Sequence, residues 1–194
     1  MLFLLWGASG SGKTTVMRAL APDLPGFAVH DFDEVGVPSD AGAAWRHQTA
    51  ETWVRRALDE QAAGRHVLLA AQLPFGELLA CPSVPDLDGV VGCLLDCDDY
   101  ERIDRIRTRG AGSGAATQDT LCWAAWLRMH AQDPQWCPDV ITTDGGPEMR
   151  WQRWQRWTAR DPRWRTTRID TTGNELGDTV QMVQAWIDRE MCRG

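Results

Sequence analysis

The sequence has little of what membrane-spanning, secreted or nucleic-acid-binding proteins need. No apolar run in its 194 residues approaches the roughly 20 residues that a membrane-spanning helix requires. The apolar start, MLFLLW, has no basic segment before it and no cleavage site after it, so we interpret it as a buried strand and not as a signal peptide. The net charge of −7 argues against nucleic acid or anionic membranes as partners. We therefore expect a cytoplasmic protein.

The sequence also lacks closely spaced cysteine pairs and has very little lysine. The six cysteines contain no C-x-x-C pair, so we expect buried thiols and not disulfides or a metal site. Lys13 is the only lysine, beside 19 arginines. A slim ammonium can enter a narrow loop that the wider guanidinium cannot enter. This contrast indicates a specific role for Lys13.

Short apolar runs alternate with helical patterns along the chain, and the length suits one α/β domain. The runs predict strands at 1–6, 27–31, 66–71, 90–96 and 166–171. The patterns between them predict helices at 12–21, 43–63, 98–109, 117–131, 146–159 and 175–190. Asp98 with Glu101 resembles a capping box, and Gly64 and Gly110 stand where helices should end. This order predicts βαβ units and a parallel sheet.

The segment Gly7–Thr14, GASGSGKT, matches G-x-x-x-x-G-K-[ST] at every position. It follows an apolar strand and opens a helix, which is the context that a phosphate-binding loop needs. Glycines let consecutive backbone N–H groups point at phosphate oxygens, while Lys13 would bridge the β- and γ-phosphates and Thr14 would hold Mg²⁺. The predicted nucleotide-binding residues here are Gly7, Ser9, Gly10, Ser11, Gly12, Lys13, Thr14 and Thr15.

Two acids, Asp31 and Asp33, follow the second predicted strand in the run HDFDE. Ligands of open α/β sheets gather at the carboxyl ends of the strands, so both acids should face the phosphate loop. Strand alternation would put them on the same side. One carboxylate can accept the proton of an acceptor hydroxyl, and the other can contact Mg²⁺ through water. The alternative is that these acids merely cap the next helix.

Together these motifs resemble the shikimate-, gluconate- and nucleoside-kinase-like group of P-loop kinases. The layout is similar to chloramphenicol phosphotransferase and to the tunicamycin-resistance P-loop proteins, which share an R-I/L-R-T-R run before a loop and a Trp-containing segment. The resemblance implies that Asp33 contacts the acceptor hydroxyl and that Asp31 lies near Mg²⁺. It also implies a three-layer fold with strand order 2-3-1-4-5, and a turn at Asp170 and Gly173 beside the adenine ring.

The third predicted strand ends in LLAAQLP, without the acid that ATP-driven machines carry there. Many small-molecule kinases of the resembling group also lack this acid. Gln72 stands after the strand and could hydrogen-bond a magnesium-bound water or the acceptor. It could equally be an ordinary polar residue at the start of a loop.

An arginine-rich helix precedes a glycine-rich stretch at 110–116. Arg105 and Arg109 lie four residues apart on one helical face, matching the lid arginines that neutralise a transferring phosphoryl group in the resembling kinases. A solvated basic face is the alternative. The stretch 110–116 could be the hinge of a lid at about 110–138, or a plain surface loop.

Eleven tryptophans are present, more than a chain of this length needs. Stripes at helical spacing around Trp123 and Trp154 favour core positions. Trp45 and Trp53 follow the two acids, where an acceptor pocket would be built, and Arg46 could add a polar contact there.

The sequence as a whole predicts a single kinase domain over 1–194 that uses ATP and Mg²⁺ to phosphorylate a hydroxyl of a nucleoside, sugar or antibiotic. An ATP-binding protein that sequesters its ligand without turnover, or a nucleotide-switch ATPase, remains an alternative. The oligomeric state is not readable from the sequence.

Overall fold

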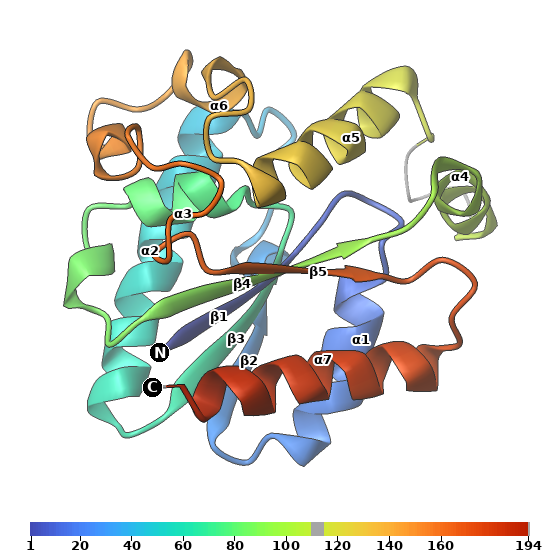
Figure 1. Ribbon diagram of the computed structural model, residues 1–194, viewed down its shortest axis with the longest axis horizontal. Coiled ribbons are helices and arrows are strands. Elements are labelled where there is room, and N and C mark those ends of the chain that lie inside the picture. Colours follow the sequence, from blue (N-terminus) through green and yellow to red (C-terminus); the bar gives the residue numbers. More distant parts are fainter. Residues whose placement is uncertain (110–114, 194) are drawn as a thin grey trace.

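The computed structural model describes residues 1–109 and 115–193, in which a five-stranded parallel sheet forms the centre (Figure 1). The strand order is β2-β3-β1-β4-β5, which confirms the expected order. The strands are β1 (Leu2–Trp6), β2 (Phe27–Asp31), β3 (His66–Ala71), β4 (Val90–Asp96) and β5 (Thr166–Asp170). All five were predicted, because strands covered on both faces of a parallel sheet read as short continuous apolar runs.

Helices cover both faces of the sheet (Figure 1). α1 (Lys13–Leu20) and α7 (Leu176–Met191) pack together on one face, and α2 (Ala43–Ala62) packs with α3 (Phe75–Ala80) on the other. Alternating residues of β1 divide between two core clusters, so that Trp6 packs towards α3 and Leu5 towards α1. The sheet is therefore the middle of three layers, as expected.

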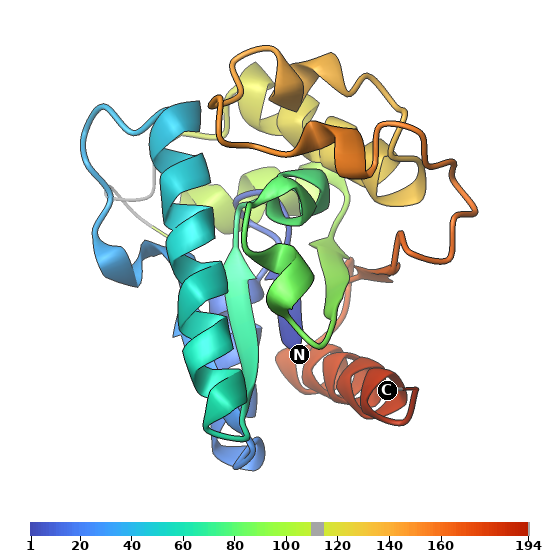
Figure 2. The same cartoon turned by 90° about the vertical axis from the view of Figure 1, so that its left-hand side faces the viewer.

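The remaining elements lie mainly at the carboxyl end of the sheet. They are α4 (Asp99–Thr108), α5 (Gln118–Gln132), α6 (Asp139–Thr142) and the 3₁₀ turns η1 (Ala21–Asp23), η2 (Phe32–Val35), η3 (Val84–Asp86) and η4 (Trp151–Arg153). Figure 2 shows α5, α6 and the segment around η4 gathered near one end of α2. Among the described residues, none of the helices combines the length and apolar character that crossing a bilayer demands.

The helix predicted over 146–159 is wrong. This segment contains only the short turn η4, because its side chains bond the backbone of other segments and hold it irregular. The Trp154 indole N–H donates to Gly76 O at 2.8 Å, and the Arg153 guanidinium donates to Pro82 O at 2.7 Å. The short helices α3 and α6 were missed, since six and four residues are too few to show a helical period.

The structure confirms some of the predicted helix ends. Asp98 caps α4, because its side chain accepts a hydrogen bond from Glu101 N at 2.7 Å. The Glu101 carboxylate does not complete the capping box and instead accepts from Gly173 N at 2.7 Å. Gly64 follows α2 with a φ of +75°, as a helix-ending glycine should. Gly110 lies outside the described residues.

A cluster of aromatic rings buries His130 of α5 at the centre of the core. Trp126 stacks on the imidazole at a centroid distance of 4.5 Å, and Trp154 and Trp164 meet it edge-on at 5.8 and 5.0 Å. Neither ring nitrogen has a hydrogen-bond partner in the described part of the chain. Burial lowers the pKa of His130 to about 3, so the folded protein holds this imidazole neutral.

We expect His130 to make folding sensitive to acid. In the unfolded chain the imidazole protonates near pH 6.5, whereas in the folded protein it stays neutral down to about pH 3. Between these values the unfolded state binds more protons, so the free energy of unfolding should fall by up to about 1.4 kcal/mol for each pH unit of acidification. Urea unfolding of the wild type and His130→Leu at pH 7.5 and pH 5 measures this effect. The wild type should lose more stability than the variant, and parallel losses would contradict the assignment.

Candidate active site

The loop Gly7–Thr14 joins β1 to α1 at the carboxyl end of the sheet. Gly7, Gly10 and Gly12 have φ values of +152°, +82° and +91°, and a Cβ on Gly7 would lie 2.3 Å from Leu95 O. Only glycine fits such a backbone, which curls over the start of α1 and leaves N–H groups free for an anion. The predicted phosphate-loop residues Gly7, Ser9, Gly10, Ser11, Gly12, Lys13, Thr14 and Thr15 all lie on this loop and the first turn of α1.

Lys13 opens α1 and folds back over the loop, where its Nζ donates to Ala8 O at 3.1 Å. Burial first, and the nearby Arg109 guanidinium second, lower the pKa of Lys13 to about 8. Bound phosphate would favour the charged form of Lys13, because a nearby opposite charge stabilises an ammonium against the loss of water. The ammonium is thus positioned to neutralise an anion on the loop.

Arg102 of α4 packs against the phosphate loop and is fully buried. Its guanidinium donates to Ser9 O at 2.8 Å, to the Asp96 carboxylate at 2.7 Å and to Cys97 O at 3.1 Å. The same Asp96 carboxylate accepts from Arg128 Nε at 2.5 Å. The arginine run predicted cationic residues here, but this structural role was missed because nothing in the spacing shows which arginine turns inward.

Thr14 and Asp31 form an oxygen pair beside the loop. The Thr14 hydroxyl donates to Asp31 Oδ2 at 2.8 Å, while Asp31 Oδ1 accepts from Asp33 N at 3.1 Å and caps η2. Asp31 therefore caps a turn and also faces the loop. A hydroxyl and a carboxylate fit Mg²⁺, which takes few protein ligands and keeps water and phosphate oxygens. The described residues contain no cluster of three or more His, Cys, Asp or Glu side chains that could hold a metal ion.

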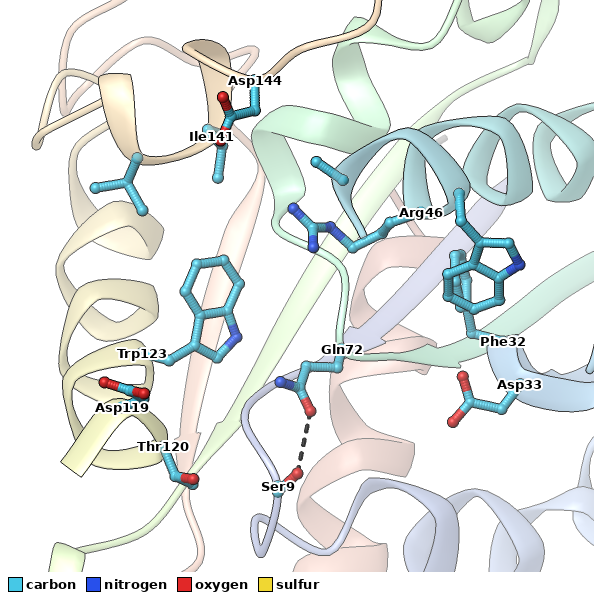
Figure 3. A pocket seen from close by; sticks show the side chains of 13 residues that line it. Ser9, Phe32, Asp33, Arg46, Gln72, Asp119, Thr120, Trp123, Ile141 and Asp144 are labelled. Atoms are coloured by element: carbon cyan, nitrogen blue, oxygen red, sulfur yellow. Dashed lines mark hydrogen bonds between the residues drawn. The ribbon is translucent and has the colours of Figure 1, made fainter. Parts of the chain in front are cut away.

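Asp33 does not lie on β2, which ends at Asp31, so strand alternation does not relate the two acids. The turn η2 instead directs the Asp33 carboxylate towards the larger of two cavities beside the phosphate loop (Figure 3). Burial raises its pKa, Asp31 raises it further, and Lys13 opposes both. A more basic carboxylate is a better acceptor for a hydroxyl proton.

The larger cavity has a volume of about 650 Å³ and lies beside the phosphate loop. It brings together the predicted residues Asp33, Trp45, Arg46 and Gln72 with the loop residue Ser9, whose hydroxyl donates to Gln72 Oε1 at 3.1 Å (Figure 3). Sequence reasoning missed the wall opposite, formed by Asp119, Thr120, Trp123, Val140, Ile141 and Asp144 of α5 and the α6 region. The i, i+4 spacing of Asp119 and Trp123 was the available signal, because it puts both on one helical face.

A smaller cavity of about 320 Å³ lies on the other side of the loop. Its walls are Ser11, Gly12, Thr15, Val16, Arg105, Thr108, Arg109, Thr171, Asn174, Leu176 and Thr179. None of the described residues lines both cavities, and the phosphate loop contributes to each. This arrangement suits two ligands that meet at the loop.

Arg105 and Arg109 differ in what they contact. Arg105 donates to the Thr171 hydroxyl and carbonyl, each at 2.8 Å, and pairs with Glu101, so it braces the turn after β5. Arg109 lines the smaller cavity, and in the described part of the chain it forms no ion pair. Of the two predicted lid arginines, Arg109 is the one available to a ligand.

The predicted lid at about 110–138 is mainly α5, which contacts β4 and β5. Its inner residues Ala124, Leu127 and Ala131 are buried in the core. Most of the predicted hinge, residues 110–114, lies outside the described residues.

The structure corrects one predicted contact residue, Trp53, and describes the predicted turn at Asp170 and Gly173. Trp53 is fully buried and its indole N–H donates to Phe32 O at 3.1 Å, so it belongs to the core and not to a ligand pocket. Asp170 pairs with Arg168 and lines neither cavity beside the loop, because its carboxylate turns towards Thr172 N. Gly173 has a φ of +67° and shapes the turn that carries Asn174 into the smaller cavity.

Comparison by sequence finds no matching family model and no matching curated protein. Solved structures do match over nearly the whole chain. A sugar kinase from Janibacter sp. shares 15% identity at a TM-score of 0.61, covering 96% of this chain and 94% of that chain. A gluconokinase from Sinorhizobium meliloti shares 16% identity at a TM-score of 0.62, covering 96% and 91%.

The Deinococcus radiodurans tunicamycin resistance protein also matches, with 16% identity, a TM-score of 0.59 and coverage of 96% and 94%. The chain therefore has the fold of P-loop small-molecule kinases. At this level of identity the likeness concerns the fold alone.

Proposed function

We propose that the protein transfers the γ-phosphate of ATP to a hydroxyl group of a small molecule. The observation that carries this proposal is the phosphate loop between two separate cavities, with Asp33 on the wall of the larger one. The smaller cavity would take the adenosine part of ATP, and the larger one the acceptor. A kinase needs this arrangement, because both substrates must meet at the γ-phosphate.

In the proposed reaction the acceptor oxygen forms a bond to the γ-phosphorus while the bond from that phosphorus to the β,γ-bridging oxygen breaks. The hydroxyl proton passes to the Asp33 carboxylate, and ADP leaves with the bridging oxygen. The loop N–H groups and Lys13 bind the β- and γ-phosphates, and Arg109 adds positive charge beside Lys13. Such fixed charges stabilise a transition state whose charge is spread over phosphoryl oxygens.

Thr14 and Asp31 are the residues that would hold Mg²⁺, which supplies further charge neutralisation to the phosphates. Gln72 and Ser9 lie between the loop and the acceptor cavity and would orient the acceptor hydroxyl or a water. Arg105 would act only indirectly, through the turn that it braces.

The test is ATP consumption by the purified protein with Mg²⁺ against nucleosides, sugars and hydroxylated antibiotics, with mass spectrometry of each acceptor. One compound should gain the mass of a phosphoryl group, and Lys13→Ala should abolish this gain. Tight ATP binding with no acceptor modified across the panel would contradict phosphotransfer and favour a protein that sequesters its ligand.

A further inference from the structure

The larger cavity carries more negative than positive charge. Its walls contain three carboxylates, Asp33, Asp119 and Asp144, and one guanidinium, Arg46. Within residues 1–109 and 115–193, none of the three carboxylates forms an ion pair or accepts a side-chain hydrogen bond. All three are exposed to the cavity or its mouth, so each is available to a ligand.

Arg46 is not free to bind an anionic acceptor. Its Nε and Nη2 each donate to the Glu77 carboxylate at 2.6 Å, and Glu77 is fully buried. In the described part of the chain, the Nε2 atom of His47 also lies 3.4 Å from Glu77 Oε1. Drawing Arg46 away would leave a buried carboxylate without its main partner, which is strongly unfavourable. The pair therefore adds no net charge to the cavity.

The aromatic wall beside the carboxylates suits a cation. Asp119 and Trp123 lie one turn apart on α5, so the carboxylate is next to the indole. Figure 3 shows Trp123 facing Arg46, with Asp119 and Asp144 on the side of Trp123. The Arg46 guanidinium lies 5.9 Å from the centroid of the Trp123 ring, so this ring already accepts a cation beside it, and Trp126 stacks on the indole at 5.1 Å. The Trp123 indole N–H is buried and has no acceptor among the described residues. Ammonium groups bind favourably against tryptophan faces and carboxylates.

We infer that the acceptor is a hydroxyl compound that carries a protonated amine, bound at the wall of Asp119, Trp123 and Asp144, and not a sugar acid or a nucleotide. This inference rests on the proposed function. A phosphate or carboxylate on the acceptor would face three unpaired carboxylates and no free arginine, whereas anion-binding sites in proteins supply unpaired arginines.

Matched acceptors test the inference directly. Amino sugars, aminoglycosides and amine-bearing nucleosides are compared with their N-acetyl derivatives, which keep every hydroxyl but lose the charge. Gluconate and thymidine monophosphate serve as anionic acceptors. Binding is followed by calorimetry with an unreactive ATP analogue, and transfer by mass spectrometry with ATP. An amine should bind and react better than its N-acetyl partner, and the anions should do neither.

The double variant Asp119→Asn/Asp144→Asn should raise the KM of the amine by about five- to tenfold, and so reduce the preference for the amine over its N-acetyl partner. Asp139→Asn is the matched control, because Asp139 lies on α6 but not on the cavity wall. A charge-dependent binding of amines without any mass gain would support the amine site and overturn phosphotransfer. Phosphorylation of a neutral or anionic acceptor in preference to an amine would overturn the inference and leave phosphotransfer standing. Binding of no amine at all would also overturn it.

Discussion

Asp33→Asn is expected to lower the turnover number by about 10²- to 10⁴-fold while leaving the affinity for ATP nearly unchanged. Asparagine keeps the size of the side chain but cannot accept the hydroxyl proton. Asp33 lines the larger cavity and not the smaller one, so its loss should spare the nucleotide. Turnover is measured by ADP release with the identified acceptor, and ATP affinity by calorimetry.

The matched control is Asp40→Asn, which makes the same change in the loop before α2, outside both cavities. It should behave like the wild type in both measurements. The kcat of the wild type should also fall on acidification as Asp33 protonates, at a pH above the usual range of an aspartate, because burial and Asp31 raise its pKa. Equal turnover by Asp33→Asn and the wild type would exclude Asp33 as the base. Unchanged ligand binding with no turnover in either protein would favour sequestration.

The phosphate loop could be predicted from the sequence because its chemistry is local. Gly7, Gly12 and Lys13 act through a backbone conformation that a few neighbouring residues determine. The sheet was equally predictable, since continuous apolar runs report burial on both faces. Strand order and the role of Asp33 came from a resemblance, and the fold then confirmed the order.

The acceptor cavity could not be predicted to the same extent, because its walls come from segments far apart in the chain. Trp123 was predicted to be in the core from helical spacing, and Trp53 was predicted to line the acceptor pocket from its position after the two acids, yet Trp53 is in the core and Trp123 lines the cavity. Spacing identifies a helical face but not the partner that the face meets. The bond between Arg46 and Glu77, which cancels the charge of Arg46, joins residues 31 positions apart. No short-range pattern reports such a pair.

The role of Arg102 beside the phosphate loop could not be predicted from the sequence for the same reason. Arg102 and Arg107 lie on the same helix, but Arg102 is fully buried, whereas the Arg107 side chain is 79% exposed. Arg102 links the loop carbonyl of Ser9 to the buried Asp96 carboxylate at the end of β4. Its aliphatic stem also touches the loop, since a Cβ on Gly10 would lie 3.0 Å from Arg102 Cγ. The conformation of the loop therefore depends on a residue far from it in sequence.

Arg102→Met is accordingly expected to lower the free energy of unfolding by about 3 kcal/mol and to weaken ATP binding. Methionine keeps most of the apolar stem but leaves Asp96, Ser9 O and Cys97 O without their shared donor. Arg128 and Arg168 still contact Asp96, at 2.5 and 3.1 Å, which limits the loss. The control is Arg107→Met, whose exposed pair with Asp104 should contribute less than about 1 kcal/mol. Urea unfolding and ATP calorimetry measure both variants, and equal stability of the two would show that the buried guanidinium does not support the loop.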